Sequence, residues 1–299
     1  MTTRRAQIFW FWIFAGPAMA GFVVFSLWPM LSSLWLSFCQ YEVVSPPRFI
    51  GFQNYIYLFA HDPSFWASVK VTSVYTVVQV PLSIVAALAL ALVLDRPLRG
   101  RGFWRAVFFL PSILPQVAFA VVFGYIFQAD GGLLNRLLAL AGIQGAAWTT
   151  SPTWALPVLI QVSLWGFGYP MVIFLAGLQN VPRELYEAAH MDGAGAWARF
   201  RHITLPLISP VILFNVVMSV IGALKVFDLA YAFGVAQLQW MPGGPARSTL
   251  FYGLNLYQQA FGFFHMGLAS AMAWILFGAI VVVTAANFRL SRRWVHYGD

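Results

Sequence analysis

FWASVKVTSVYTVVQVPLSIVAALALALVL, residues 65–94, contains one formally charged side chain, that of Lys70. A helix of this length would extend about 45 Å, whereas the hydrocarbon core of a bilayer is about 30 Å thick. A surface helix of a soluble domain would instead carry charged or polar residues along one face. The segment therefore predicts a helix that spans a membrane.

Five further segments of the chain are also long and apolar. The chain is 61% hydrophobic and 9% charged, with a mean hydropathy of +0.76, whereas soluble domains contain about 25% charged residues. Backbone groups in lipid must be satisfied within the segment, and no segment shows the alternation of a barrel strand. We therefore predict an all-α membrane protein in which residues 1–299 form a single transmembrane domain. The six expected spans are residues 8–38, 65–94, 106–127, 154–178, 205–232 and 266–288.

Arginines set the expected orientation of these spans. With the N-terminus in the cytoplasm, twelve arginines fall on the inner side and three on the outer side, which is the asymmetry that the positive-inside rule requires. Both chain ends are therefore expected inside, and the formal charge of +8 is explained by topology and anionic headgroups without nucleic acid. The inner set is Arg4, Arg5, Arg96, Arg99, Arg101, Arg105, Arg183, Arg199, Arg201, Arg289, Arg292 and Arg293, and the outer set is Arg48, Arg136 and Arg247.

The N-terminal segment shares some features with a cleavable signal peptide. Arg4 and Arg5 precede an apolar stretch that reaches the small residues around Ala18 and Ala20. The apolar run does not stop there but continues to Phe38. This continuation favours a retained membrane anchor.

Motifs for catalysis or metal binding are missing from the sequence. Cys39 is the only cysteine, and His190 and His202 are twelve residues apart, so neither a disulfide nor a metal site is predicted. The two lysines, Lys70 and Lys225, do not follow glycine, so the phosphate-binding GxxxxGK[ST] motif does not occur. We expect a non-enzymatic chain with no cofactor of its own.

The loop over residues 179–206 is the longest inner loop and the most polar segment. Pro182 and Glu184 suit the first turn of a short helix, and Asp192-Gly193 suits its end, because glycine readily adopts the left-handed conformation. Ala188 and Ala189 leave one side of this helix nearly bare, which permits close approach by a partner. A second short helix would place Trp197, Phe200 and Ile203 in an apolar stripe. An ordinary charged inner loop is the simpler alternative.

The order of residues in this loop resembles the EAA signature of permease subunits in ATP-binding-cassette importers. Glu187-Ala188-Ala189, Gly193 and Ile203 with Leu205-Pro206 match every defined position of the signature. The resemblance implies a coupling helix that seats on a cytoplasmic ATPase subunit. The coupling residues that it implies are Glu187, Ala188, Ala189, Asp192, Gly193, Ile203, Leu205 and Pro206.

The resemblance also implies an assembly and a location. The expected partners are a second related permease, two ATPase subunits that bind ATP and Mg²⁺, and an extracytoplasmic binding protein. The expected location is the bacterial cytoplasmic (inner) membrane. In such an assembly ATP hydrolysis belongs to the partner subunits, and this chain provides the path.

Several other segments are similar to the carbohydrate-uptake branch of these permeases, in particular its maltose-type or glycerol-phosphate-type first half. They include residues 49–55, 62–66, 110–115 and 131–135, and Phe227-Asp228 followed by Gly243-Gly244-Pro245. The branch implies a sugar, oligosaccharide or glycerophosphate as the solute. Two features depart from the pattern: the stretch over residues 229–242 is longer, with Gln237-Leu238-Gln239-Trp240-Met241 in it, and His190 stands where an apolar or small residue is usual.

Polar and small side chains recur on one face of two expected spans. Their spacing of three or four residues places them on one side of each helix. Aromatic and amide groups suit a sugar, although helix packing would use the same residues. The candidate solute pathway consists of Gln161, Trp165, Tyr169, Asn215, Ser219, Gly222 and Val226.

Lys225 and Asp228 are expected on one helix, three residues apart, where they could form a pair. Whether such a pair would be structural or functional is left open by the sequence. A self-sufficient secondary transporter is the alternative function, but it predicts inverted repeats or a buried proton-carrying carboxylate, and neither is evident. A membrane scaffold that transports nothing would leave the bare helix side and the polar stripe unexplained.

Overall fold

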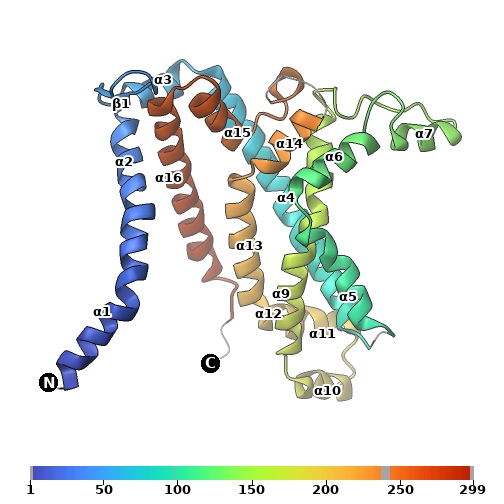
Figure 1. Cartoon of the computed structure of the whole chain (residues 1–299). Helices are drawn as coiled ribbons and strands as arrows, with labels where there is room; N and C mark the ends of the chain where they lie inside the picture. Colours follow the sequence, from blue (N-terminus) through green and yellow to red (C-terminus); the bar gives the residue numbers. More distant parts are fainter. Residues whose placement is uncertain (1–2, 98, 237–242, 297–299) are drawn as a thin grey trace. The chain divides into compact units, whose positions relative to one another are not determined.

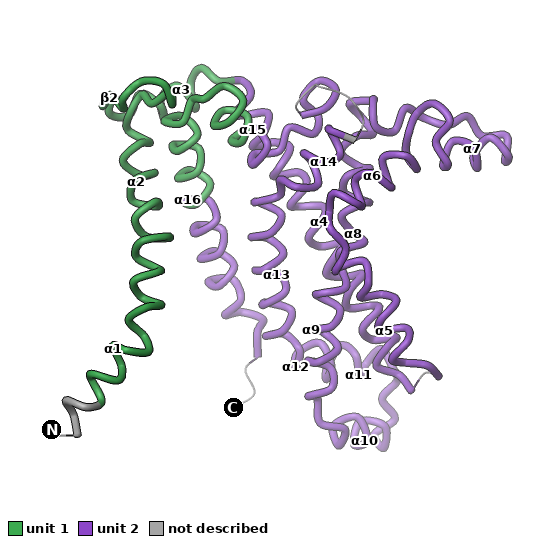
Figure 2. Tube along the Cα trace, in the orientation of Figure 1, with its two compact units in different colours: residues 1–62, 256–277 green, residues 63–255, 278–299 purple. Residues whose placement is uncertain are grey.

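The computed structural model describes residues 3–97, 99–236 and 243–296. It divides into two compact units, Met1–Asp62 with Leu256–Phe277 and Pro63–Asn255 with Gly278–Asp299 (Figure 2). Within the described residues, four helices are long and apolar enough to cross a membrane, and the number rises to six if each of two bent helix pairs is one span. The chain is thus a helical, membrane-type protein.

The first unit begins with a long apolar helical segment and continues into a small hairpin (Figure 1). Its most apolar stretch, within Gln7–Ser37, is entirely unburied by this chain, as expected for a helix that faces lipid. The hairpin pairs Cys39 with Phe49, and the Asn54 amide closes it by donating hydrogen bonds to the carbonyls of Ser37 and Cys39, both at 2.9 Å. The elements are α1 (Thr3–Phe22), the π-helical turn η1 (Val23–Leu27), α2 (Trp28–Ser37), β1 (Cys39–Gln40), β2 (Arg48–Phe49), α3 (Gln53–Ala60) and η6 (Gln258–Gly262).

The second unit is a bundle of helices (Figure 1). Two elements cross the boundary between the units, α15 (Tyr252–Tyr257) and α16 (Met266–Ser291). The others are α4 (Pro63–Asp95), α5 (Arg101–Phe109), η2 (Leu110–Ile113), α6 (Gln116–Ile126), α7 (Leu133–Leu140), α8 (Ala155–Leu164), η3 (Trp165–Phe167), α9 (Gly168–Gln179), α10 (Arg183–Met191), α11 (Ala196–Arg199), η4 (Phe200–Thr204), α12 (Leu205–Leu207), α13 (Ser209–Leu224), α14 (Asp228–Ala236) and η5 (Pro245–Arg247).

Helix α4 is the centre of this bundle and packs against α8, α9 and α13. Ala87 and Ala91 on α4 are fully buried, and such small residues let membrane helices approach closely. Helices α9 and α13 also approach closely, because a Cβ added at Gly177 would lie 2.9 Å from a methyl carbon of Val211. Close helix contacts of this kind hold α4, α9 and α13 together in the bundle.

Two of the expected straight spans are bent. The segment expected at 106–127 turns by 95° between Ile113 and Gln116, where Leu114 adopts an extended conformation before Pro115, as residues that precede proline tend to do. The segment expected at 205–232 starts earlier and turns by 66° near Ile208, between Leu207 and Ser209. Pro115 lies at the first bend, and Pro206 and Pro210 flank the second, so the sequence indicates both bends.

The prediction that Lys225 and Asp228 share one helix is wrong. Helix α13 ends at Leu224, and α14 begins at Asp228. Lys225 caps α13 with a backbone conformation outside the helical region, so the three-residue spacing no longer places the two side chains on one helical face. Both side chains are exposed.

Candidate functional site

The loop over residues 179–206 folds as two short helices, as predicted from its sequence. Helix α10 covers Arg183–Met191 and α11 covers Ala196–Arg199. Pro182 occupies the position before the first helical residue, and Glu184 lies in the first turn, where the positive end of the helix dipole stabilises an acidic group.

Helix α10 ends in a Schellman motif at Gly193. The Gly193 amide donates to the His190 carbonyl at 3.0 Å, and the Ala194 amide donates to the Ala189 carbonyl at 2.8 Å. Gly193 has a φ of 75°, a left-handed conformation that glycine adopts without steric cost. The predicted helix end at Asp192-Gly193 is confirmed.

The signature residues of α10 form a surface that we call the α10 face, made of Glu187, Ala188, Asp192 and Gly193. All four are exposed, and Ala189 beside them is half-buried. A Cβ added at Gly193 would meet no atom within 4 Å. The α10 face is therefore a small-residue surface with open space above it and two carboxylates at its edges.

Met191 and Leu185 add apolar area to helix α10 that the sequence analysis did not single out. Met191 is 86% exposed and Leu185 is 43% exposed. The signature consists of small and acidic positions, whereas neighbouring apolar residues on an amphipathic helix give no distinct signal in the sequence. Exposed methionine is well suited to adaptable contact with another protein surface.

Ile203, Leu205 and Pro206 do not lie on α10. They belong to the π-helical turn η4 and to α12, which lead into α13. Ile203 packs against the buried core of the second unit. These three residues therefore belong to the connection between the loop and the bundle.

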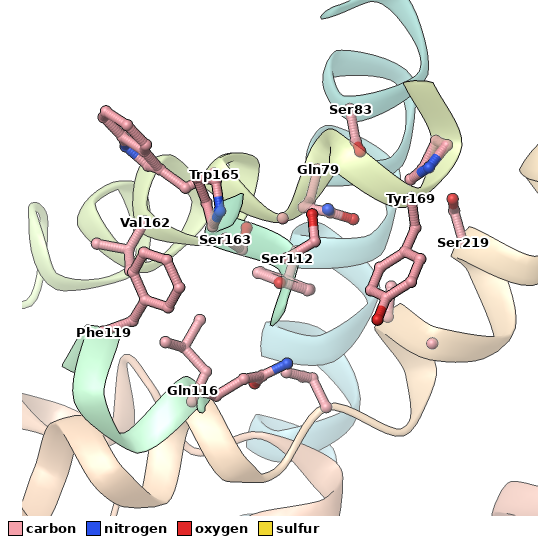
Figure 3. A pocket seen from close by; sticks show the side chains of 18 of the residues that line it. Gln79, Ser83, Ser112, Gln116, Phe119, Val162, Ser163, Trp165, Tyr169 and Ser219 are labelled. Atoms are coloured by element: carbon pink, nitrogen blue, oxygen red, sulfur yellow. The ribbon is translucent and has the colours of Figure 1, made fainter. Parts of the chain in front are cut away.

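A cavity of about 320 Å³ lies in the second unit and is lined by residues of several helices (Figure 3). Its volume falls within the range of small-molecule sites, about 300–1,000 Å³. Its wall contains both polar side chains and aromatic rings. The lining residues are Tyr75, Gln79, Ser83, Pro111, Ser112, Leu114, Gln116, Phe119, Val162, Ser163, Trp165, Gly166, Tyr169, Pro170, Ser219, Gly222, Ala223, Val226 and Leu229.

Most of the candidate pathway residues meet at this cavity, and two do not. Those in its lining are Trp165, Tyr169, Ser219, Gly222 and Val226. Gln161 is exposed on α8 and outside the lining. Asn215 is 2% exposed, and its amide donates to the Val211 carbonyl of the same helix at 3.1 Å, so this amide turns to its own helix backbone.

The cavity also contains polar residues that the sequence analysis missed. They come from the second, third and fourth apolar segments, where isolated serine and glutamine side chains interrupt the apolar run. Polar side chains in a membrane helix need polar partners. Their presence in these apolar segments could therefore have indicated a polar cavity. The missed residues are Gln79, Ser83, Ser112, Gln116 and Ser163.

Two exposed rings of the cavity are supported from outside by phenylalanines. Trp165 lies 5.7 Å from Phe123, and Tyr169 lies 5.3 Å from Phe109, measured between ring centroids. Neither phenylalanine belongs to the lining. The two rings therefore present firmly held apolar surfaces, while amides and hydroxyls supply donors and acceptors. Such a wall suits a ligand with both apolar faces and hydroxyl groups.

The start of α9 is tightly packed at the cavity wall. A Cβ added at Gly168 would overlap the Ser112 hydroxyl and would lie 3.0 Å from the Phe108 carbonyl oxygen. Glycine at this position thus lets the end of α5 and η2 pack directly against α9. Within the described ranges, no group of three or more His, Cys, Asp or Glu residues could hold a metal ion.

Comparison with known proteins places the chain in a class. Residues 79–296 match the family described as binding-protein-dependent transport system inner membrane component. The chain is 43% identical to the probable ABC transporter permease protein YesP of Bacillus subtilis (strain 168), over 95% of this chain and 91% of YesP. It is 38% identical to the lactose transport system permease protein LacF of Rhizobium radiobacter, over 94% of this chain and 93% of LacF.

A similar fold occurs in the crystal structure of a bacterial alginate ABC transporter in complex with an alginate pentasaccharide-bound periplasmic protein. The TM-score is 0.83 at 22% identity, over 98% of this chain and 99% of the other. This chain is a permease of the ABC transporter class. It belongs to the family of binding-protein-dependent transport system inner membrane components.

Proposed function

We propose that this chain is the translocation subunit of an ATP-driven importer. It would receive a sugar, oligosaccharide or glycerophosphate from an extracytoplasmic binding protein and pass it across the bacterial cytoplasmic membrane by alternating access. The observation that carries the proposal is the exposed α10 face in a chain of this family. Sugar permeases among the relatives, such as LacF, support the solute class.

The proposed topology has six crossings with both chain ends in the cytoplasm. Each bent helix pair then counts as one crossing. The excess of arginines on the inner side supports this orientation. It puts the α10 face in the cytoplasm, where a nucleotide-hydrolysing partner could reach it.

Coupling to ATP is proposed to run through the loop over residues 179–206. A partner can shift a conformational equilibrium only through contacts that differ between the two states. Glu187 would be the polar contact of α10, Ala188 and Ala189 would permit close packing, and Gly193 would fix the helix end. Ile203, Leu205 and Pro206 would pass the motion of the loop to α13.

The partners in this proposal are a second related permease, two ATPase subunits and the binding protein. ATP and Mg²⁺ would bind to the ATPase subunits, and this chain would perform no catalysis. The solute would pass along the cavity lined by Trp165, Tyr169, Ser219, Gly222 and Val226. A complementary wall from the partner permease would complete the path.

Reconstitution separates this function from secondary transport. Proteoliposomes would contain this chain alone, or this chain with the partner permease, the ATPase and the binding protein encoded beside it. We expect solute uptake only in the complete mixture. It should also require ATP on the side of the membrane that carries the ATPase subunits. Uptake by this chain alone, driven by a proton or sodium gradient, would contradict the proposal.

A further inference from the structure

The cavity of about 320 Å³ in the second unit has no formally charged side chain among the described residues of its wall. Among the described residues that line it, the polar groups are hydroxyls and amides, and there is no Asp, Glu, Lys, Arg or His. The amides Gln79 and Gln116 come from α4 and α6, and Ser219 comes from α13 (Figure 3). Each of these groups can donate as well as accept hydrogen bonds.

We infer that the solute carried through this cavity is an uncharged saccharide, and not a sugar acid or a glycerophosphate. The inference rests on the proposed function, and it narrows the solute class. An anion that leaves water requires a cation or several charge-assisted donors to offset its lost hydration. Phosphate and carboxylate sites in proteins accordingly use arginine or lysine, and the lining offers neither.

The nearest charges along the chain do not change this picture. Lys225 and Asp228 directly precede the lining residues Val226 and Leu229, but both are exposed and outside the lining. Two buried nitrogens of Arg105 have no hydrogen-bond partner. Arg105 is not a lining residue, however, and it precedes Pro111, the first lining residue of its segment, by more than one helical turn.

The apolar part of the wall fits the same class of solute. Trp165 is 48% exposed and Tyr169 is 56% exposed, and the phenylalanines behind both rings hold them in place. The C–H faces of a pyranose pack on such rings, while its hydroxyls need partners that both donate and accept. Ser83, which is 5% exposed, and Ser219 are available for this at the edge of the cavity.

Family membership does not decide the charge of the solute. The lactose permease LacF carries the name of a neutral disaccharide, whereas the structure with the similar fold was determined with alginate, a polymer of sugar acids. The preference for a neutral or charged solute must therefore follow from the residues that line each path, and this chain supplies one wall of it. In this chain those residues favour a neutral one.

The test uses the complete importer in proteoliposomes, with its own binding protein. The probes are neutral di- and trisaccharides of hexoses and pentoses, di- and trisaccharides of uronic acids, and glycerol 3-phosphate. We expect ATP-dependent uptake of at least one neutral saccharide at a rate at least tenfold above that of every anionic probe. ATP-dependent uptake of an anionic probe in preference to the neutral ones would overturn the inference and leave the proposed function standing. No ATP-dependent uptake of either class would overturn both.

A matched pair of variants locates the effect at the cavity. Gln116→Glu replaces an exposed lining amide by a carboxylate of nearly the same shape, and Gln128→Glu makes the same change at an exposed position outside the lining. The ratio of neutral to anionic uptake is compared with wild type. It should rise at least threefold in Gln116→Glu, because a carboxylate in the lining repels an anionic probe, and it should stay at the wild-type value in Gln128→Glu. An unchanged or lower ratio in Gln116→Glu would show that the solute does not pass this wall and would overturn the inference.

Discussion

The hydroxyl of Tyr186 on α10 lies 2.8 Å from the Thr204 hydroxyl, which ends the π-helical turn η4. Thr204 is 4% exposed, and the Tyr186 ring packs against the buried core of the second unit. The hydrogen bond thus joins α10 to the end of the loop over residues 179–206, across eighteen positions of the chain. A force on α10 would reach α12 and α13 through this bond as well as through the backbone.

Removing this bond should weaken the coupling of ATP hydrolysis to transport. We expect Tyr186→Phe to lower solute uptake severalfold while ATP hydrolysis by the complex continues, because the lost bond contributes about 1 kcal/mol. The measurement is the number of solute molecules imported per ATP hydrolysed in proteoliposomes.

Thr204→Val is the matched variant, since it removes the other hydroxyl and keeps the shape of the side chain. The double variant should be no worse than the worse single variant, because both remove the same bond. Additive losses in the double variant would show that the two hydroxyls act separately. Unchanged transport per ATP in Tyr186→Phe would contradict the role of the bond.

Gly193 offers a second test of the α10 face. Asparagine and aspartate both tolerate the left-handed backbone that Gly193 adopts, and the space above Gly193 is open in this chain. We therefore expect Gly193→Asp to insert into the membrane at normal levels but to stop uptake, since it places bulk and charge where a partner would dock. Uptake and membrane content are measured together.

Gly193→Asn separates the effect of charge from that of size. It should retain more uptake than Gly193→Asp, because it adds similar bulk without a charge. Normal uptake by Gly193→Asp would count against docking at this face. Loss of the aspartate variant from the membrane would instead point to a folding defect, and that is why membrane content is the control.

The close contact at Gly168 predicts a difference between two neighbouring glycines. Gly168→Ala forces a methyl group against the Ser112 hydroxyl and the Phe108 carbonyl, whereas a Cβ at Gly166 would meet no atom within 4 Å. Overpacking of this kind costs about 1–3 kcal/mol. Gly168→Ala should lower the thermal unfolding temperature of the purified complex by several degrees, and Gly166→Ala should leave it nearly unchanged.

Ser112→Ala should partly restore the stability of the Gly168 variant, because it removes the nearest obstructing atom. The restoration is only partial, since the Phe108 carbonyl oxygen remains 3.0 Å from the added carbon. Equal stability of Gly166→Ala and Gly168→Ala would show that η2 and α9 can move apart without cost.

The helical membrane fold could be predicted because apolar length is a local property of the sequence. The end of α10 at Gly193 was predictable for the same reason, as were the two short helices of the inner loop. The bends near Pro115 and Ile208 were within reach, because proline marks both places. The predicted single helix through Lys225 failed because no proline or glycine marks the end of α13 at Leu224.

The cavity was predicted only in part. Periodicity along one helix found Trp165, Tyr169 and Ser219, since residues three or four apart share a face. It could not show that Asn215 turns to its own backbone, or that Gln79 and Ser112 from other helices meet the same space. Such contacts depend on how helices pack, which one sequence does not encode locally. The longer stretch over residues 229–242 includes Gln237, Leu238, Gln239, Trp240 and Met241, which lie outside the described residues.

The most direct measurement of the central proposal is a crosslink from the α10 face to an ATPase subunit. Cys39 is the only cysteine and is buried, so Cys39→Ser provides a background in which Ala188→Cys or the control Leu137→Cys is the single thiol. Both positions are exposed. In the assembled complex, Ala188→Cys should crosslink to an ATPase subunit and react with reagents on the cytoplasmic side only, whereas Leu137→Cys should do neither. Labelling of Ala188→Cys from the outside, or crosslinks that never reach an ATPase subunit, would contradict coupling through α10.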